Sequence, residues 1–285
     1  MVKFWLKKCW SVMQLQTKLF LSVFLLSLTL LFSCQSEKKL ARGFIADSTR
    51  PSLYITFSAD WEMFFIKPQG SSVSETYARR YFPYRSYFLK NNGTAGVDSI
   101  FKSSLNLSLQ SNGFDLYSDS TVNNFLIDDG DKFIIEFVQM YVEEKTLPVG
   151  DTLYFANNSF IQFDTVISSI DLCFWLRINP VDDTLLASPL LYASFPLVDY
   201  FDGAWDYDLS SDRYIYNYNF TEFGETDIYM LFENAGKKLA GYMYDYFLNQ
   251  YLFKHMRRNP YAYYTWNGSF LRRAGQERFV FMKNP

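Results

Sequence analysis

The sequence predicts an α+β fold, with a mainly antiparallel sheet and two amphipathic helices packed on one face. Two segments, 97–112 and 226–256, repeat apolar residues at a spacing of three and four, which is typical of helices. Several other segments run apolar or alternate over five or more residues between turn residues, as strands do. Helices and strands do not alternate regularly along the chain, which argues against a doubly wound parallel sheet.

Both predicted helices begin with a Ser, Thr or Asp that can cap the first turn, and Gly113 follows the end of the first. The apolar stripe of the second helix is broad, so we expect it to be deeply buried. A helical turn is predicted at 121–126.

The clearest strand is 159–179, in which every second residue from Ile170 onward is apolar and therefore faces the core. A tight turn at 128–131 leads into the strand 132–145. In the strand 213–220, four aromatic residues alternate with other residues. The predicted strands are 53–57, 61–66, 86–89, 114–117, 132–145, 152–156, 159–179, 190–198, 213–220 and 279–282.

Residues 200–220 are dense in Tyr and Asp, and they supply the candidate binding surface. Its residues are Trp205, Tyr214, Tyr216 and Tyr218. Aromatic faces beside carboxylates and Asn are typical of carbohydrate-binding surfaces, which use ring stacking and hydrogen bonds. The alternative is that these rings pack on the helix 226–256 and fill the core.

The first 33 residues have the parts of an export signal: four lysines and no acidic residue, then the apolar run 19–32. This run is shorter than the ~20 residues of a membrane-spanning helix. Leu31-Phe32-Ser33-Cys34 resembles the lipobox of bacterial lipoproteins. The resemblance implies cleavage before Cys34 and acylation of this residue by several chains, which stable anchoring requires. A cleaved secretory signal and an uncleaved anchor are the alternatives.

The predicted organisation is therefore a signal peptide at 1–33, a flexible tether at 34–50 and one α+β domain at 51–285. Lys38-Lys39 do not match an inner-membrane retention signal, which favours the outer membrane. Whether the domain faces the periplasm or the cell surface is left open.

The charge of the chain and its cysteine content limit the partners and the disulfides that it can have. Removal of residues 1–33 leaves 23 basic against 30 acidic residues, so the net charge falls from −3 to about −7. An acidic chain without a basic tract argues against nucleic acid as a partner. Cys173 lies in an apolar strand and is predicted to be a buried core residue, without a disulfide partner once Cys34 is acylated.

The sequence has no motif typical of a catalytic site, a metal site or a cofactor site. The protein is therefore predicted not to be an enzyme. His255 lies among basic residues late in a helix, unlike a tuned catalytic base. The acidic turn 128–131 lacks the Glu that closes a calcium loop, because the twelfth position is Gln139. Glu143 and Glu144 are neighbours on a strand, so their side chains point to opposite faces and cannot flank one glycosidic bond.

The order of a lipobox, the helix opening Asp98-Ser99-Ile100-Phe101, an acidic strand and the helix around 233–240 resembles envelope lipoproteins that assist transport or assembly machines. Its aromatic and Asn content is similar to that of Bacteroidetes lipoproteins. The resemblance implies an accessory or assembly factor of a transport, secretion or motility complex, with an envelope protein as partner. The alternative function is a surface glycan-binding lipoprotein.

Overall fold

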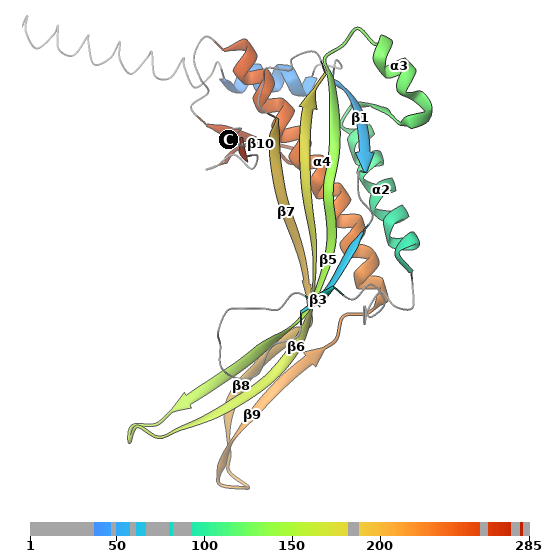
Figure 1. The fold of residues 1–285 in the computed structure, drawn as a ribbon. Coiled ribbons are helices and arrows are strands. Elements are labelled where there is room, and N and C mark those ends of the chain that lie inside the picture. Colours follow the sequence, from blue (N-terminus) through green and yellow to red (C-terminus); the bar gives the residue numbers. More distant parts are fainter. Residues whose placement is uncertain are drawn as a thin grey trace, which may run out of the picture. The chain divides into compact units, whose positions relative to one another are not determined.

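A computed structural model describes residues 37–46, 50–57, 61–66, 80–81, 93–181, 188–256, 262–274 and 280–281 (Figure 1). The signal peptide, Cys34 and the strand predicted at 86–89 lie outside these residues. The fold is α+β with strands dominant, as predicted. Within the described ranges, no helix combines the length and the apolar character that a membrane crossing requires.

The described residues form two compact units, whereas the sequence suggests one domain at 51–285. The larger unit takes the described parts of 49–244 and 277–285, and the smaller unit those of 1–48 and 245–276. The helix α4 (Glu225–His255) contributes to both. This division was not visible in the sequence because a single apolar stripe runs the length of α4.

The main sheet of the larger unit has the strand order β12-β7-β6-β5-β1-β4, and β2 and β3 branch from β5. β5, β6, β7 and β12 pair antiparallel, while β1 runs parallel to both β4 and β5. β2 is parallel to β5 and antiparallel to β3. The strands are β1 (Ser52–Phe57), β2 (Glu62–Ile66), β3 (Arg80–Tyr81), β4 (Asp115–Tyr117), β5 (Lys132–Tyr154), β6 (Phe160–Pro180), β7 (Pro189–Val198) and β12 (Val280–Phe281).

Two helices cover one face of this sheet, as the sequence predicts. Phe101 of α2 (Gly93–Ser111) stacks on Phe174 of β6 with ring centroids 4.9 Å apart. Phe232 of α4 meets Trp61 at 5.2 Å, and Trp61 also meets Phe174 at 5.5 Å. Large aromatic side chains from both helices and the sheet therefore form the centre of the core. Gly236 on α4 allows the two helices to pack closely.

β5 differs from its prediction, because the two strands expected at 132–145 and 152–156 are one strand of 23 residues. Its pairing with β6 continues from Phe133↔Pro180 to Tyr154↔Phe160, with one bulge between Phe137 and Gln139. Pro148 lies in this strand beyond Lys145, where the pairing with β2 ends. A proline is tolerated there because one edge of β5 has no described partner strand.

A short helical region follows β4 in the chain and packs against β1 and β4. Gly113 has φ 85° and ends α2, as expected of a glycine after a helix. The predicted turn at 121–126 is a 3-10 turn, η1 (Asp119–Thr121), followed by α3 (Val122–Ile127). In the predicted acidic turn, Asp128 accepts a hydrogen bond from Ser52, which lowers the pKa of its carboxyl group.

In the smaller unit, the tether prediction is wrong over residues 37–46, which form a helix. Glu37, Ala41 and Phe44 of this helix are buried, and Phe44 packs on Tyr251 of α4 at 5.3 Å. The hairpin of β10 (Tyr263–Trp266) and β11 (Leu271–Ala274) completes the unit. This helix could not be predicted from the composition of residues 37–46, because its buried face includes a glutamate and so lacks a continuous apolar stripe.

Candidate binding surface

The candidate residues lie on an arm of the larger unit, which we define as residues 147–166 and 200–221. The first segment is the far half of the β5–β6 hairpin, and the second is the hairpin of β8 (Tyr200–Asp208) and β9 (Arg213–Thr221). Figure 1 shows the two hairpins side by side. β5 and β6 continue from the main sheet into the arm without a break, so the arm is anchored by the sheet itself.

The structure brings the four predicted residues together on one face of the β8–β9 hairpin. The register pairs Trp205 with Tyr216, Tyr207 with Tyr214, and Gly203 with Tyr218. Because side chains alternate between faces along a strand, this face is entirely aromatic apart from Gly203. Its rings are Phe201, Trp205, Tyr207, Tyr214, Tyr216, Tyr218 and Phe220.

The middle of this aromatic face packs against the β5–β6 hairpin. The Tyr216 ring stacks on Phe163 of β6 with centroids 4.2 Å apart, and Trp205 meets Tyr216 edge-on at 5.1 Å. Gly203 is required here, because a Cβ at this position would lie 2.6 Å from the Tyr216 ring. Tyr216 and Trp205 therefore hold the arm together. The described ring contacts of Tyr216 and Trp205 lie within the arm, and none of these is with the helix 226–256.

The outer rings of the same face are exposed. Tyr218 is 56% exposed and Tyr214 is 41% exposed, although they also touch Phe163 and Phe155 respectively. Nine of the seventeen large hydrophobic side chains exposed in the described residues lie on the arm. They are Tyr154, Phe160, Val166, Tyr200, Tyr207, Leu209, Tyr214, Tyr218 and Phe220. Such a concentration of exposed apolar side chains is typical of interaction surfaces.

Seven of these nine are not among the residues predicted from the sequence. Three of the seven, Tyr154, Phe160 and Val166, lie outside the segment 200–220, which alone was treated as a binding surface. Tyr154 and Phe160 flank the β5–β6 turn and touch at 6.0 Å, and Leu209, 87% exposed, lies at the β8–β9 turn. An apolar residue at the tip of a polar turn was the available signal for Leu209.

The arm is acidic, with six Asp residues and a single basic residue, Arg213. Asp202, Asp206 and Asp208 alternate with the rings along β8 and therefore lie on the opposite face of the hairpin. At the turn, hydrogen bonds from Ser211 and Ser210 lower the pKa of Asp208 to about 2. This carboxylate stays charged at neutral pH and orders the turn.

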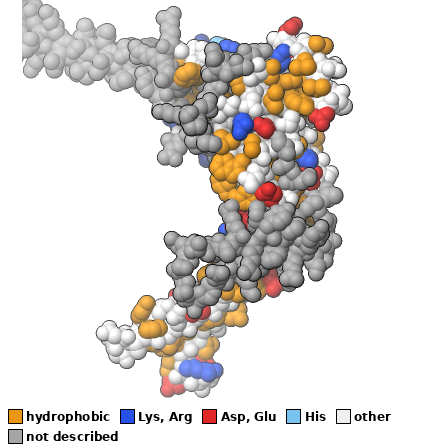
Figure 2. All heavy atoms as spheres, viewed as in Figure 1, with side chains coloured by type: hydrophobic (Ala, Val, Ile, Leu, Met, Phe, Trp, Pro, Cys, Tyr) orange, Lys and Arg blue, Asp and Glu red, His pale blue; other side chains and the backbone are white. Residues whose placement is uncertain are grey.

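A second group of rings lies on the sheet face that α2 and α4 do not cover, the helix-free face. Trp175 of β6 meets Tyr192 of β7 at 4.8 Å, and Figure 2 shows hydrophobic side chains gathered over this face. Beneath them, Cys173 is 2% exposed, which confirms the predicted burial.

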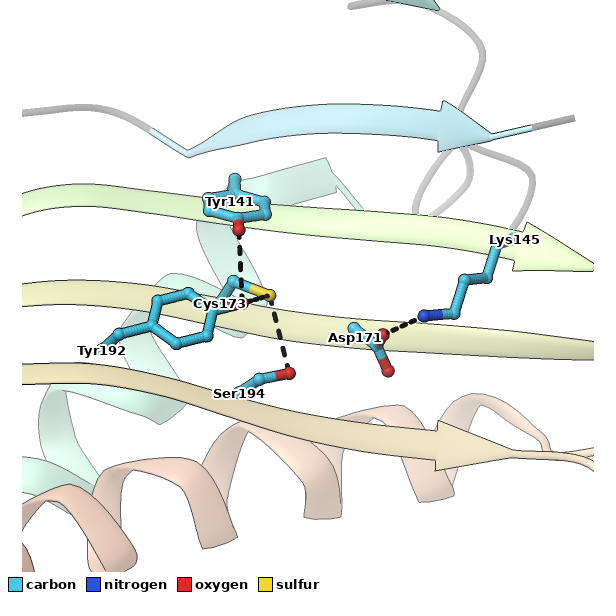
Figure 3. A network of polar contacts seen from close by, with 6 residues as sticks. All are labelled: Tyr141, Lys145, Asp171, Cys173, Tyr192 and Ser194. Carbon is cyan, nitrogen blue, oxygen red and sulfur yellow. Dashed lines mark hydrogen bonds and ion pairs between the residues drawn. The ribbon is translucent and has the colours of Figure 1, made fainter. Parts of the chain in front are cut away.

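Figure 3 shows the polar contacts around this thiol. The Tyr192 hydroxyl donates to the Cys173 sulfur at 3.4 Å and lies 3.4 Å from the Tyr141 hydroxyl. Burial, and then these hydrogen bonds, raise the pKa of Tyr192 well above its usual value. Nearby, burial opposes the charge of Lys145, but its ion pair with Asp171 outweighs this and raises the pKa of Lys145. These contacts link β5, β6 and β7 around the buried thiol.

The structure does not bring the residues that were considered for catalysis together in one site. Glu144 is 2% exposed and lies on the opposite face of β5 from Glu143. His255 ends α4, stacks on Tyr251 at 4.1 Å and lies at 2.9 Å from its carbonyl oxygen. Within the described ranges, no three His, Cys, Asp or Glu side chains are grouped as metal ligands would be. Neither a protein-family model nor a curated protein matches this chain.

Proposed function

We propose that this protein is a non-enzymatic lipoprotein, anchored through acylated Cys34 in the outer membrane, that serves as an accessory or assembly factor of an envelope protein complex. The arm is its docking surface. The observation that carries this proposal is the concentration of exposed rings on the two packed hairpins, 147–166 and 200–221. Transport, secretion and motility complexes are the candidate partners.

The arm has the properties of a protein-docking surface. Tyr side chains are prominent in the residues that dominate binding energy at protein interfaces, because they offer large contact areas with little entropy loss. The stacking of Tyr216 on Phe163 orders the arm before binding, which lowers the entropic cost of association. Because the arm carries six Asp and one basic residue, we expect the partner surface to be positively charged.

Glycan binding is the second candidate, and the geometry favours it less. A sugar site needs a ring and hydrogen-bonding groups directed at the same ligand. On the β8–β9 hairpin, Asp206 and Asn217 lie on the face opposite to Trp205 and contact one another at 3.5 Å. The tyrosine hydroxyl groups and the buried indole N–H of Trp205 are the polar groups that share the aromatic face. Titration of Trp205 fluorescence with a panel of polysaccharides tests this alternative.

Site-specific photo-crosslinking in living cells tests the docking proposal. A crosslinker is placed at Tyr218 on the arm and, as the matched control, at Leu107, a 66% exposed residue of α2. We expect one discrete adduct at position 218 and none at position 107. Tyr214→Lys changes a 41% exposed ring on the same face of β9, four residues from Tyr218, and should abolish the adduct at position 218 without unfolding the protein.

Adducts of similar pattern at both positions would contradict docking through the arm. The anchor is tested separately, by palmitate labelling of the wild type and of Cys34→Ser. We expect label in the wild type alone, and release of the variant from the membrane fraction.

A further inference from the structure

The exposed charged side chains that the structure describes in the smaller unit are all basic. They are Lys38, Lys39, Arg42, Lys254, Arg272 and Arg273. The two acidic residues described in this unit, Glu37 and Asp245, are 0% and 5% exposed. Since the whole chain has 27 basic and 30 acidic residues, this unit concentrates positive charge on its surface.

Both acidic residues are engaged inside the unit. Glu37 accepts a hydrogen bond of 2.6 Å from the Tyr264 hydroxyl and lies 3.8 Å from the Arg273 guanidinium. Asp245 accepts a hydrogen bond of 2.7 Å from the backbone N–H of Trp266. The Arg273 guanidinium is therefore held next to a buried acid.

Three of the cations share one side of the helix at 37–46. Lys38, Lys39 and Arg42 are exposed, while Ala41 and Phe44 are buried against the unit. At 3.6 residues per turn, the three cations span an arc of about 100°. We call this exposed side of the helix the basic face.

Exposed aromatic residues accompany the cations elsewhere in the unit. Phe253, next to Lys254, is 58% exposed, and Phe270 is 45% exposed. The Arg272 guanidinium lies over the Phe270 ring, 4.4 Å from its centroid. Basic residues interspersed with exposed aromatic side chains are typical of surfaces that lie at the membrane–water interface.

We propose that the smaller unit binds anionic phospholipid headgroups through its basic face, at the membrane that holds the anchor. This inference rests on the proposed acylation of Cys34, which fixes where the unit lies. Cys34 precedes Glu37 by three residues, and three residues span at most about 11 Å. A chain acylated at Cys34 therefore keeps this buried glutamate, and the helix that it begins, next to the headgroups. That placement favours lipid over nucleic acid as the source of negative charge.

Vesicle co-sedimentation tests the proposal without the anchor. A chain that begins at residue 35 retains every residue that the structure describes, and so all of the contacts above. Its binding is measured with vesicles of phosphatidylcholine alone and of phosphatidylcholine with phosphatidylglycerol, at low and at high salt. We expect binding to the anionic vesicles that weakens as salt is added.

The triple variant Lys38→Gln, Lys39→Gln and Arg42→Gln should lower the partition coefficient on anionic vesicles by about 100-fold, because each cation near an anionic surface contributes about fivefold. The control, which removes three exposed cations of the larger unit, should bind as the wild type does. Its substitutions are Arg213→Gln, Lys237→Gln and Lys238→Gln.

No binding, equal binding to both kinds of vesicle, or an equal loss in the control variant would each overturn the proposal. Since this chain lacks Cys34, these outcomes are independent of palmitate labelling, which tests the anchor. Nuclease treatment of the purified protein before the assay removes bound nucleic acid as a source of the signal.

Discussion

The close packing of α2 on α4 at Gly236 predicts opposite effects of the same substitution at two glycines of α4. A Cβ at Gly236 would lie 2.8 Å from the Phe101 carbonyl oxygen and 2.9 Å from the Leu105 nitrogen, both backbone atoms of α2. A Cβ at Gly241 would meet no heavy atom within 4 Å other than those of its chain neighbours and of its own helix backbone. Gly241→Ala is therefore the matched control for Gly236→Ala.

The expected magnitudes follow from two competing terms. Ala is favoured over Gly inside a helix by about 0.8–1.0 kcal/mol, so Gly241→Ala should stabilise the protein by about that amount. Gly236→Ala gains the same term but must displace the backbone of α2, and overpacking of this kind costs about 1–3 kcal/mol. With two backbone atoms in the way we take the upper end, which gives a net loss of about 2 kcal/mol.

Urea unfolding followed by far-UV circular dichroism measures the difference, which should be about 3 kcal/mol between the two variants. Because the chain has two compact units, amide hydrogen exchange in β6 is followed as well, since β6 belongs to the larger unit alone. A Gly236→Ala variant that matched or exceeded Gly241→Ala in stability would refute the close packing of α2 on α4.

Three further predictions concern the arm and the helix-free face. Tyr216→Ala removes the ring stacked on Phe163 and should destabilise the arm by about 2 kcal/mol, seen as faster amide exchange in β8 and β9; unchanged exchange would contradict the packing. The carboxyl group of Asp208 should titrate near pH 2 by NMR, and Ser211→Ala should move its pKa upward. Because the folded pKa is lowered, the contribution of the charged carboxylate to stability is present at neutral pH and is lost as the pH falls through about 2; an ordinary Asp pKa in the native protein would disprove this. In a chain that begins at residue 35, Cys173 is the remaining cysteine, and its thiol should react with thiol reagents in urea but resist them in buffer, whereas rapid labelling of the folded protein would show that the site opens.

Local patterns in the sequence were sufficient for much of the fold. The stripes at 97–112 and 226–256 predicted the two helices to within a few residues at each end, because burial on one face leaves a repeat in the sequence. The alternation from Ile170 onward predicted the core face of β6 for the same reason. The four predicted ring residues also share one face, as the period of a strand requires.

What the sequence did not reveal depends on contacts between distant segments. β8 was missed because Gly203 interrupts its alternation of rings, and the ring that covers this glycine comes from Tyr216 on β9. The helix at 37–46 buries Glu37, and its partner Tyr264 is 227 residues away. The parallel position of β1 between β4 and β5 is likewise set by the sheet as a whole, not by any local pattern.

The continuity of β5 and β6 has a mechanical consequence. A pull on the tip of the arm along the strand axis is transmitted through unbroken backbone into the main sheet. There it loads the ladders to β1 and β7 in shear, so that many hydrogen bonds must yield together. A force applied at the tip of the arm would therefore be transmitted directly to the main sheet, because β5 and β6 pass from the arm into the sheet without a flexible connection.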